Sequence, residues 1–162
     1  METTIVLPCV EEVLAVDDSY RIIIAEDDAA LASLLVRLIL RHYPTAVIQA
    51  FGNGQDALAA YDQTGADLLF VNHGMPRMDG PTMIRILRAR DDSVPTIGMS
   101  GNPWLYDAYM AAGATAFVES WELIDQFSAL LRRFLPPTPR SVQPAARERT
   151  VAEQYPPEAS GA

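Results

Sequence analysis

The sequence predicts an α/β fold in which a parallel sheet is covered by helices on both faces. Two observations lead to this prediction. Short apolar runs alternate with amphipathic helical patterns five times, and the links between them are short. The first run, residues 21–25, is almost continuously apolar, as expected of a strand that is buried on both faces. Strands joined in this way require right-handed crossovers, so they run parallel.

Five apolar runs are predicted as the strands of this sheet. In chain order they are residues 21–25, 46–51, 68–71, 95–99 and 116–118. The first run is rich in β-branched isoleucine, a residue type that favours strands.

Five stretches between and after these strands are predicted as helices. In the first, apolar residues at 31, 34, 35, 38 and 39 share one face, and Arg37 and Arg41 lie opposite. The other four are residues 54–61, 81–89, 103–112 and 121–134. Pro81 near a helix start and Gly113 just after a helix end stand where these residue types are best tolerated.

The composition indicates a globular domain with no strong attraction to nucleic acid or membrane. The chain has 162 residues, of which 49% are apolar, and a net charge of −9 that disfavours contact with phosphates. No run approaches the roughly 18 uninterrupted apolar residues that a membrane span requires. Cys9 is the single cysteine, which excludes an intrachain disulfide and favours a cytoplasmic location. All 12 basic residues are arginine, so the chain has no lysine.

The two ends of the chain differ from this alternating body. Residues 1–19 form an N-terminal extension with a mixed run at 10–16 that is compatible with a short helix. Residues 136–162 are rich in proline and poor in large apolar groups, so this tail is predicted to be disordered. The predicted domain therefore spans residues 20–135.

Polar residues gather where the predicted strands end. Glu26, Asp27 and Asp28 follow the first strand, Asn72 follows the third, and Ser100 follows the fourth. In an open parallel sheet, the functional crevice lies at the carboxyl ends of the strands. We therefore expect these side chains to form the candidate site.

Residues 20–134 resemble the receiver domains of response regulators, proteins of two-component and phosphorelay signalling. The landmarks are the loop Met75-Pro76-Arg77-Met78-Asp79-Gly80, which is similar to the family's loop after the third strand, the acidic pair Glu26 and Asp27, the switch hydroxyl Ser100 and the switch aromatic Phe117. Four landmarks in the family's order and spacing make a specific match. The resemblance implies a flavodoxin-like, doubly wound fold with five strands in the order 2-1-3-4-5.

Two positions depart from the family's pattern. Receivers accept phosphate on an aspartate that ends the third strand, where this chain has Asn72. They hold a lysine and usually a cis proline after the fifth strand, where this chain has Ser120 and Trp121. An amide oxygen is a far poorer nucleophile than a carboxylate, and the lysine would have contacted a phosphoryl oxygen. The resemblance therefore implies a degenerate receiver, or pseudo-receiver, and a trans peptide bond at 120–121.

The acidic pair remains in this altered site. Glu26 and Asp27 are the candidate metal ligands, but without an aspartate at position 72 we expect them to hold Mg²⁺ weakly or not at all. Two facing carboxylates predict either a raised pKa on one of them or a weakly held cation. The alternative is that both acids cap the next helix. Asn72 is interpreted as a hydrogen-bonding strut, and its deamidation to aspartate is the alternative.

The fourth predicted helix carries aromatic residues on more than one face. Tyr109 and Ala112 can face the sheet, which leaves Trp104, Tyr106 and Met110 as candidates for exposure. Exposed aromatic side chains favour a protein interface, and packing against the fifth helix is the alternative. In the receiver family this face binds partners or forms dimers.

Together these features predict a stand-alone receiver-like signalling module that acts by phosphorylation-independent protein–protein interaction. We expect no enzymatic activity, no cofactor beyond a weakly held Mg²⁺, and no contact with nucleic acid or membrane. The expected partner is another signalling protein or a second copy, bound at the face of the fourth and fifth helices. Two alternatives stay open. One is phosphorylation at a non-standard residue such as Asp28 or Asp79, and the other is a small-molecule sensor that uses the vacated pocket.

Overall fold

The computed structural model describes residues 19–90 and 92–136. The predicted N-terminal extension and proline-rich tail lie outside the described residues, except for Ser19 and Pro136 at their inner ends. The description below concerns the α/β domain.

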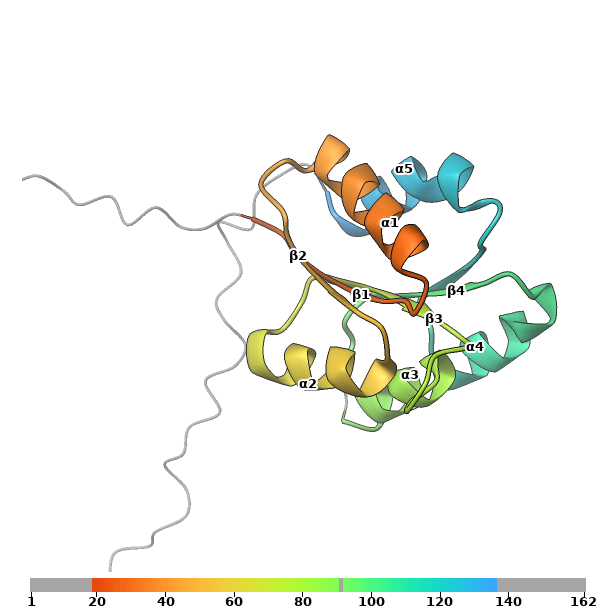
Figure 1. The fold of residues 1–162 in the computed structure, drawn as a ribbon. Helices are drawn as coiled ribbons and strands as arrows, with labels where there is room; N and C mark the ends of the chain where they lie inside the picture. Colours follow the sequence, from red (N-terminus) through yellow and green to blue (C-terminus); the bar gives the residue numbers. More distant parts are fainter. Residues whose placement is uncertain (1–18, 91, 137–162) are drawn as a thin grey trace, which may run out of the picture. The chain divides into compact units, whose positions relative to one another are not determined.

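The sheet has five parallel strands, which run through the centre of the domain (Figure 1). They are β1 (Arg21–Ala25), β2 (Val47–Phe51), β3 (Leu68–Asn72), β4 (Thr96–Ser100) and β5 (Ala116–Glu119). Their order in the sheet is β2-β1-β3-β4-β5, which confirms the predicted fold and strand order. The chain therefore has the doubly wound, flavodoxin-like architecture.

Helices cover both faces of this sheet. They are α1 (Ala29–His42), α2 (Gly54–Thr64), α3 (Gly80–Ala89), α4 (Tyr106–Ala112) and α5 (Leu123–Phe134), with a 3₁₀ turn η1 (Pro103–Leu105) before α4. Figure 1 shows α1 and α5 on one face and α2, α3 and α4 on the other. The crossovers place successive helices on the side that a right-handed connection requires.

Alternate residues of the central strands pack into two separate apolar layers, one on each face of the sheet. Ile22 and Ile24 of β1 belong to the layer beneath α1 and α5, where Phe70 and Phe127 stack with ring centroids 5.3 Å apart. Ile23 and Ala25 belong to the layer beneath α2 and α3. This division explains why the run at 21–25 is continuously apolar, since side chains alternate across a strand and both faces are buried.

The structure corrects several helix boundaries: α2 runs to Thr64, three residues beyond the prediction, and two other helices begin later than predicted. The stretch 103–112 was predicted as one helix, but it begins as η1, where the Asn102 side chain accepts from the backbone N–H of Trp104 at 3.1 Å. The last helix begins at Leu123 instead of Trp121, because residues 120–122 form a turn in which Glu122 N–H donates to Glu119 O. The 120–121 peptide bond is trans, as expected.

Arg88 ties the end of α3 to the segments that flank β4. Its guanidinium donates to the backbone carbonyl oxygens of Gly113 (2.8 Å), Asp92 (2.7 Å) and Val94 (3.0 Å). A rigid planar fork suits such simultaneous donation to several acceptors. Within the described ranges, no helix is both long and apolar enough to cross a bilayer.

Candidate functional site

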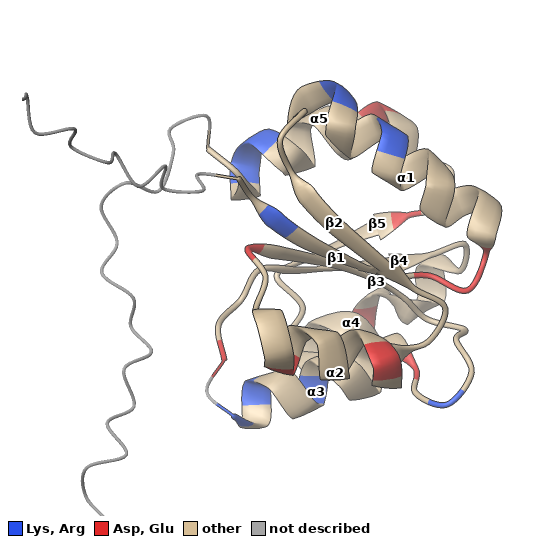
Figure 2. Ribbon diagram, turned by 60° about the vertical axis from the view of Figure 1, so that its left-hand side comes forward, with Lys and Arg blue, Asp and Glu red and all other residues tan. Residues whose placement is uncertain are grey.

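The polar residues singled out in the sequence meet at the carboxyl ends of β1 and β3. These two strands are neighbours in the sheet, and Ala25, the last residue of β1, pairs with Val71 beside the end of β3. Figure 2 shows the acidic stretch between β1 and α1 in red at this end of the sheet. Strand adjacency therefore places Glu26 and Asp27 next to Asn72, as predicted.

Asn72 connects the two acidic side chains through its amide group. The amide nitrogen Nδ2 donates to Glu26 Oε1 at 2.9 Å and to Asp27 Oδ1 at 3.2 Å. The amide oxygen accepts from the backbone N–H of His73 at 2.8 Å, which fixes the orientation of the group. Both the nitrogen and the oxygen of the amide thus form hydrogen bonds within the site, as expected of a hydrogen-bonding strut.

Helix capping is performed by the next residue, Asp28. Its side chain accepts from the backbone N–H groups of Ala30 (2.8 Å) and Leu31 (3.2 Å) at the start of α1. Its own backbone N–H donates to Glu26 Oε1 at 3.0 Å. The alternative that Glu26 and Asp27 cap this helix is therefore wrong, and the pair faces the site.

Glu26 is deeply buried for a carboxylate, with an exposed fraction of 3%. Burial is the main cause that raises the pKa of Glu26, and the nearby charge of Asp27 raises it further. Hydrogen bonds from Asp28 N–H and the Asn72 amide act in the opposite direction. The expected raised pKa on one acid is confirmed, although burial contributes more than the facing carboxylate. Among the described residues, Glu26 Oε2 has no hydrogen-bond partner.

This raised pKa predicts the pH dependence of a Glu26→Gln variant. A folded-state pKa above the ordinary value of 4.5 means that Glu26 contributes most stability below that pH and loses the contribution as pH rises through its folded pKa. Glutamine cannot titrate. We therefore expect the variant and the parent to be similarly stable near pH 4, and the variant to gain on the parent as pH rises to 7. Urea unfolding at several pH values measures the difference.

An exposed acid provides the control for this experiment. Asp107→Asn removes one carboxylate from the surface of α4. The pH dependence of its stability difference from the parent is the reference for removing a surface carboxylate. A Glu26→Gln difference that does not exceed this reference between pH 4 and pH 7 would contradict the prediction.

The residues present do not offer Mg²⁺ an open set of oxygen ligands. Mg²⁺ requires several oxygen ligands in near-octahedral geometry. Here the Asn72 amide presents a donor nitrogen to Glu26 and Asp27, and its oxygen is occupied by His73 N–H. The described part of the chain also contains no group of three or more His, Cys, Asp or Glu side chains arranged for a metal. The contacts that a bridging cation would make with the two acids are made by the amide.

Ser100 and Phe117, the switch-like residues, lie on the two strands beyond β3. Ser100 ends β4, is buried, and its hydroxyl accepts from the backbone N–H of Asn102 at 3.1 Å. Phe117 of β5 is half-buried, and its ring lies between those of Tyr106 (5.9 Å between centroids) and Tyr109 (5.3 Å). The hydroxyl and the ring are thus each engaged by the segment that follows β4.

Tyr109 is an internal residue whose importance was missed in the sequence. It is fully buried, and its hydroxyl donates to the carbonyl oxygens of Val71 (3.0 Å) and Met99 (3.3 Å) at the ends of β3 and β4. Burial raises the pKa of Tyr109 far above its ordinary range, so the hydroxyl stays a donor. The signal available in the sequence was Gly98, since a glycine inside a strand often marks close approach of another group.

Ser120, where the resemblance led us to expect the family's lysine, directly follows β5. Its backbone N–H donates to Ser100 O at 2.9 Å, which extends the pairing of β4 and β5 by one residue. Because β4 lies between β3 and β5, Ser120 is two strands away from Asn72. A short hydroxyl side chain there cannot supply the charge of an ammonium group.

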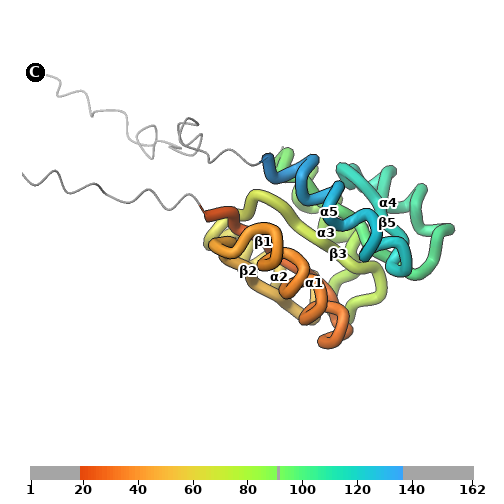
Figure 3. Tube along the Cα trace, turned by 90° about the horizontal axis from the view of Figure 1, so that it is seen from above, coloured from red at the N-terminus to blue at the C-terminus, as the bar shows by residue number. Residues whose placement is uncertain are grey.

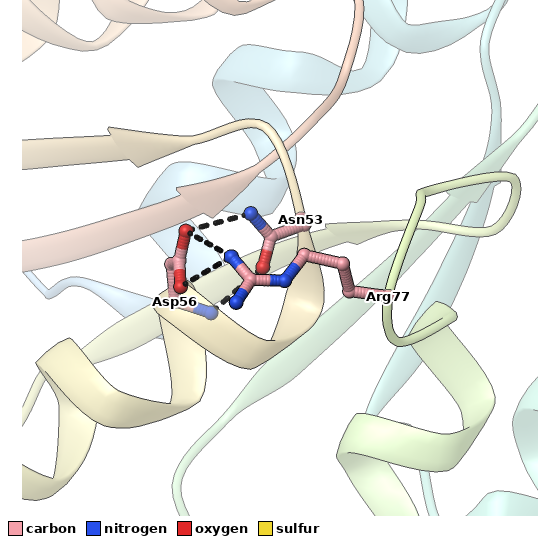
Figure 4. Close-up of polar contacts among 3 residues, drawn as sticks. All are labelled: Asn53, Asp56 and Arg77. Atoms are coloured by element: carbon pink, nitrogen blue, oxygen red, sulfur yellow. Dashed lines mark hydrogen bonds and ion pairs between the residues drawn. The ribbon is translucent and has the colours of Figure 1, made fainter.

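An ion pair and a backbone hydrogen bond join the loop between β3 and α3 to the start of α2. Arg77 donates to Asp56 at 3.2 Å, and Asp56 also accepts from the side chain of Asn53 at 2.7 Å (Figure 4). Gly54 N–H donates to Met78 O at 3.2 Å. Arg77 has a φ of 67°, a left-handed conformation that costs a non-glycine residue about 1 kcal/mol or more. Sequence reasoning missed this contact, because nothing local links positions 56 and 77.

Large apolar side chains are exposed around α4 and the start of α5. The exposed fractions are 89% for Trp104, 52% for Tyr106 and 38% for Met110, which confirms the predicted exposure of these three residues. Trp121 and Ile124, which were not predicted, are exposed as well. Both α4 and α5 contact β5, and Figure 3 shows the three elements side by side. We call Trp104, Tyr106 and Met110, which lie in η1 and α4, the aromatic face.

The sequence matches the response regulator receiver domain family over residues 22–120, more than half of the chain, so the chain belongs to this family. It is therefore a receiver domain of the kind found in two-component response regulators. Among curated proteins it is similar to the DNA-binding response regulator MtrA of Mycobacterium tuberculosis, with 33% identity over 121 residues. It is also similar to the transcriptional regulatory protein TrcR of the same organism, with 29% identity over 119 residues.

These relatives are longer proteins. The matches cover 70% of this chain but only 51% of MtrA and 46% of TrcR. The chain thus spans about half the length of the curated relatives that it matches.

Solved structures show the same fold. The chain is similar to the chemotaxis protein CheY4 of Vibrio cholerae, with a TM-score of 0.62, 18% identity, and coverage of 72% of this chain and 99% of that chain. It is also similar to the receiver domain of the sensor histidine kinase PA1611 of Pseudomonas aeruginosa, with a TM-score of 0.61, 18% identity, and coverage of 72% and 97%. That structure is described with a magnesium ion coordinated in its active-site cleft.

Proposed function

We propose that this chain is a pseudo-receiver, a signalling module that acts through protein–protein contact without being phosphorylated. It needs no enzymatic activity for this role and no bound metal. Its partner is another signalling protein or a second copy of the chain.

The amide of Asn72 is the single observation that carries this proposal. It occupies the end of β3 and donates to both Glu26 and Asp27. A carboxylate nucleophile is absent from this position, and the amide nitrogen already donates hydrogen bonds to both facing acids. Phosphoryl transfer depends on positioned charge that stabilises the transferred group, and the chain has no lysine to supply it.

The alternative acceptors Asp28 and Asp79 already serve as helix caps. Asp28 caps α1, and the Asp79 side chain accepts from the backbone N–H of Thr82 at 2.8 Å at the start of α3. Each of these carboxylates is therefore already used as the hydrogen-bond acceptor at a helix start, a contribution of about 1 kcal/mol. This arrangement favours the proposal over a phosphorelay that uses a non-standard residue.

Intact mass spectrometry tests this proposal directly. The chain is incubated with acetyl phosphate and Mg²⁺, and its mass is followed with time. We expect the mass to stay unchanged, because the residue that ends β3 is an amide and not a carboxylate. A stable added phosphoryl mass on a fraction of the protein would overturn the proposal, and peptide mapping would then identify the acceptor.

We further propose that the partner binds at the aromatic face. Trp104 exposes more of its surface than any other large apolar side chain of the described residues. Exposed tryptophan and tyrosine are frequent at the centres of interfaces, because they bury large areas at a low cost in side-chain entropy.

Affinity capture with matched variants tests this binding face. Trp104→Ala is expected to lose the proteins, or the second copy, retained by the parent chain, by at least tenfold if Trp104 is a hot spot worth about 2 kcal/mol. Val47→Ala is the control, since Val47 is an exposed apolar residue on β2 at the opposite edge of the sheet. Equal retention by the parent and Trp104→Ala would place the contact elsewhere.

A further inference from the structure

The cross-strand row that contains Phe117 has a gap that another side chain fills. Along this row Ala25 pairs with Val71, Val71 with Gly98, and Gly98 with Phe117. Gly98 has no side chain, so the space between Val71 and Phe117 must be filled from elsewhere. Tyr109 of α4 fills it.

The fit of Tyr109 against Gly98 is close. A Cβ added at Gly98 would lie 2.3 Å from Tyr109 Cδ1 and 2.6 Å from Cε1, so the ring lies directly against the backbone of β4. At its far end, the hydroxyl is held by the carbonyl oxygens of Val71 and Met99. The ring is therefore fixed both by contact and by hydrogen bonds.

We infer that Tyr109 is a positioning residue that holds Phe117 in one conformation. The Phe117 ring contacts the buried ring of Tyr109 and the half-exposed ring of Tyr106. Movement of Phe117 toward β4 would require the space that the buried Tyr109 ring already occupies. Ser100, next along β4 on the same face, keeps its hydroxyl engaged with Asn102 N–H.

As a consequence, the surface formed by Tyr106 and Phe117 has a single conformation. Tyr106 and Phe117 keep the same arrangement whatever happens at the acidic site, because the Tyr109 ring occupies the space beside Gly98 that Phe117 would have to enter. This inference goes beyond the proposed function. It concerns the packing of α4 and β5, and it holds whether or not residue 72 can be phosphorylated.

Fluorine NMR of the full chain labelled with fluorophenylalanine tests this role. The chain has five phenylalanines, and Phe117→Leu identifies the Phe117 signal. In the parent chain we expect one Phe117 resonance without millisecond exchange. In Tyr109→Leu, which empties part of the row, we expect a second Phe117 resonance or a several-fold increase in its exchange broadening. Phe70, on the other face of the sheet, is the internal control and should not respond.

Tyr109→Phe separates the ring from the hydroxyl. It keeps the ring against Gly98 and should retain a single Phe117 resonance. Millisecond exchange of Phe117 in the parent chain would overturn the inference, even if Tyr109→Leu does not fold. A Phe117 signal that is unchanged in a folded Tyr109→Leu would overturn it as well.

Discussion

Replacing Asn72 with aspartate is expected to destabilise the metal-free protein by about 3 kcal/mol and to make its stability depend on Mg²⁺. The change removes a donor that contacts both Glu26 and Asp27 and adds a third carboxylate beside them. Three oxygen-bearing side chains would then meet without an internal counter-charge, which is the type of site that a divalent cation stabilises. Urea unfolding with and without millimolar MgCl₂ measures both effects.

Asn72→Ala distinguishes the loss of the donor from the gain of a charge. It leaves Glu26 and Asp27 without the amide but adds no carboxylate. We expect a smaller loss of stability and little response to Mg²⁺, and we expect the parent chain to respond little as well. If Asn72→Asp unfolded like the parent chain in both buffers, the hydrogen bonds from the amide would have no role in stabilising the acidic pair.

Gly80→Ala is expected to destabilise the fold by about 3 kcal/mol, although alanine is the better helix former. Gly80 begins α3 beneath the candidate site. A Cβ there would lie 2.4 Å from the backbone oxygen of Asn72 and 2.5 Å from the Tyr109 hydroxyl. The Asn72 oxygen belongs to the backbone, and the Tyr109 hydroxyl is hydrogen-bonded to two carbonyl groups, so moving either atom would cost free energy. The strain therefore exceeds the helix-propensity gain, which is at most about 1 kcal/mol.

Gly52→Ala is the matched control for Gly80→Ala. No heavy atom of the surroundings lies within 4 Å of the position of its added Cβ. Its free energy of unfolding should stay within about 0.5 kcal/mol of the parent value. If Gly80→Ala were as stable as this control, the close contact of α3 with the end of β3 would be relaxed in solution.

The layout of the site was predictable from the sequence because it depends on strand adjacency. Apolar runs located the strands to within one or two residues, and the resemblance supplied their order. Residues that end neighbouring parallel strands must lie close together, so the meeting of Glu26 and Asn72 followed without side-chain detail. A raised pKa on Glu26 or Asp27 was one of the two predicted outcomes, but the choice of Glu26 and its main cause, burial, were not predicted. How deeply a carboxylate is buried depends on the packing around it.

Other features could not be predicted because they join distant positions through side-chain geometry. The Tyr109 ring packs against Gly98 of β4, and its hydroxyl donates to the carbonyl oxygen of Val71 on the neighbouring strand β3. Helix periodicity indicated only that Tyr109 faces the sheet. The contact between Arg77 and Asp56 depends on the left-handed backbone at residue 77, which no local pattern announces. The exposure of Trp121 followed from the late start of α5, a boundary that the sequence placed two residues early.

Both ends of the described domain are held together, far from the acidic side chains. Tyr20, just before β1, donates its hydroxyl to the carbonyl oxygen of Pro136, and Tyr43 donates to that of Leu135 at 2.5 Å. The domain is therefore entered and left at the amino ends of the strands, whereas Glu26, Asp27 and Asn72 lie at the carboxyl ends. An attachment made directly at Ser19 or Pro136 would therefore join the domain at the end of the sheet opposite Glu26, Asp27 and Asn72.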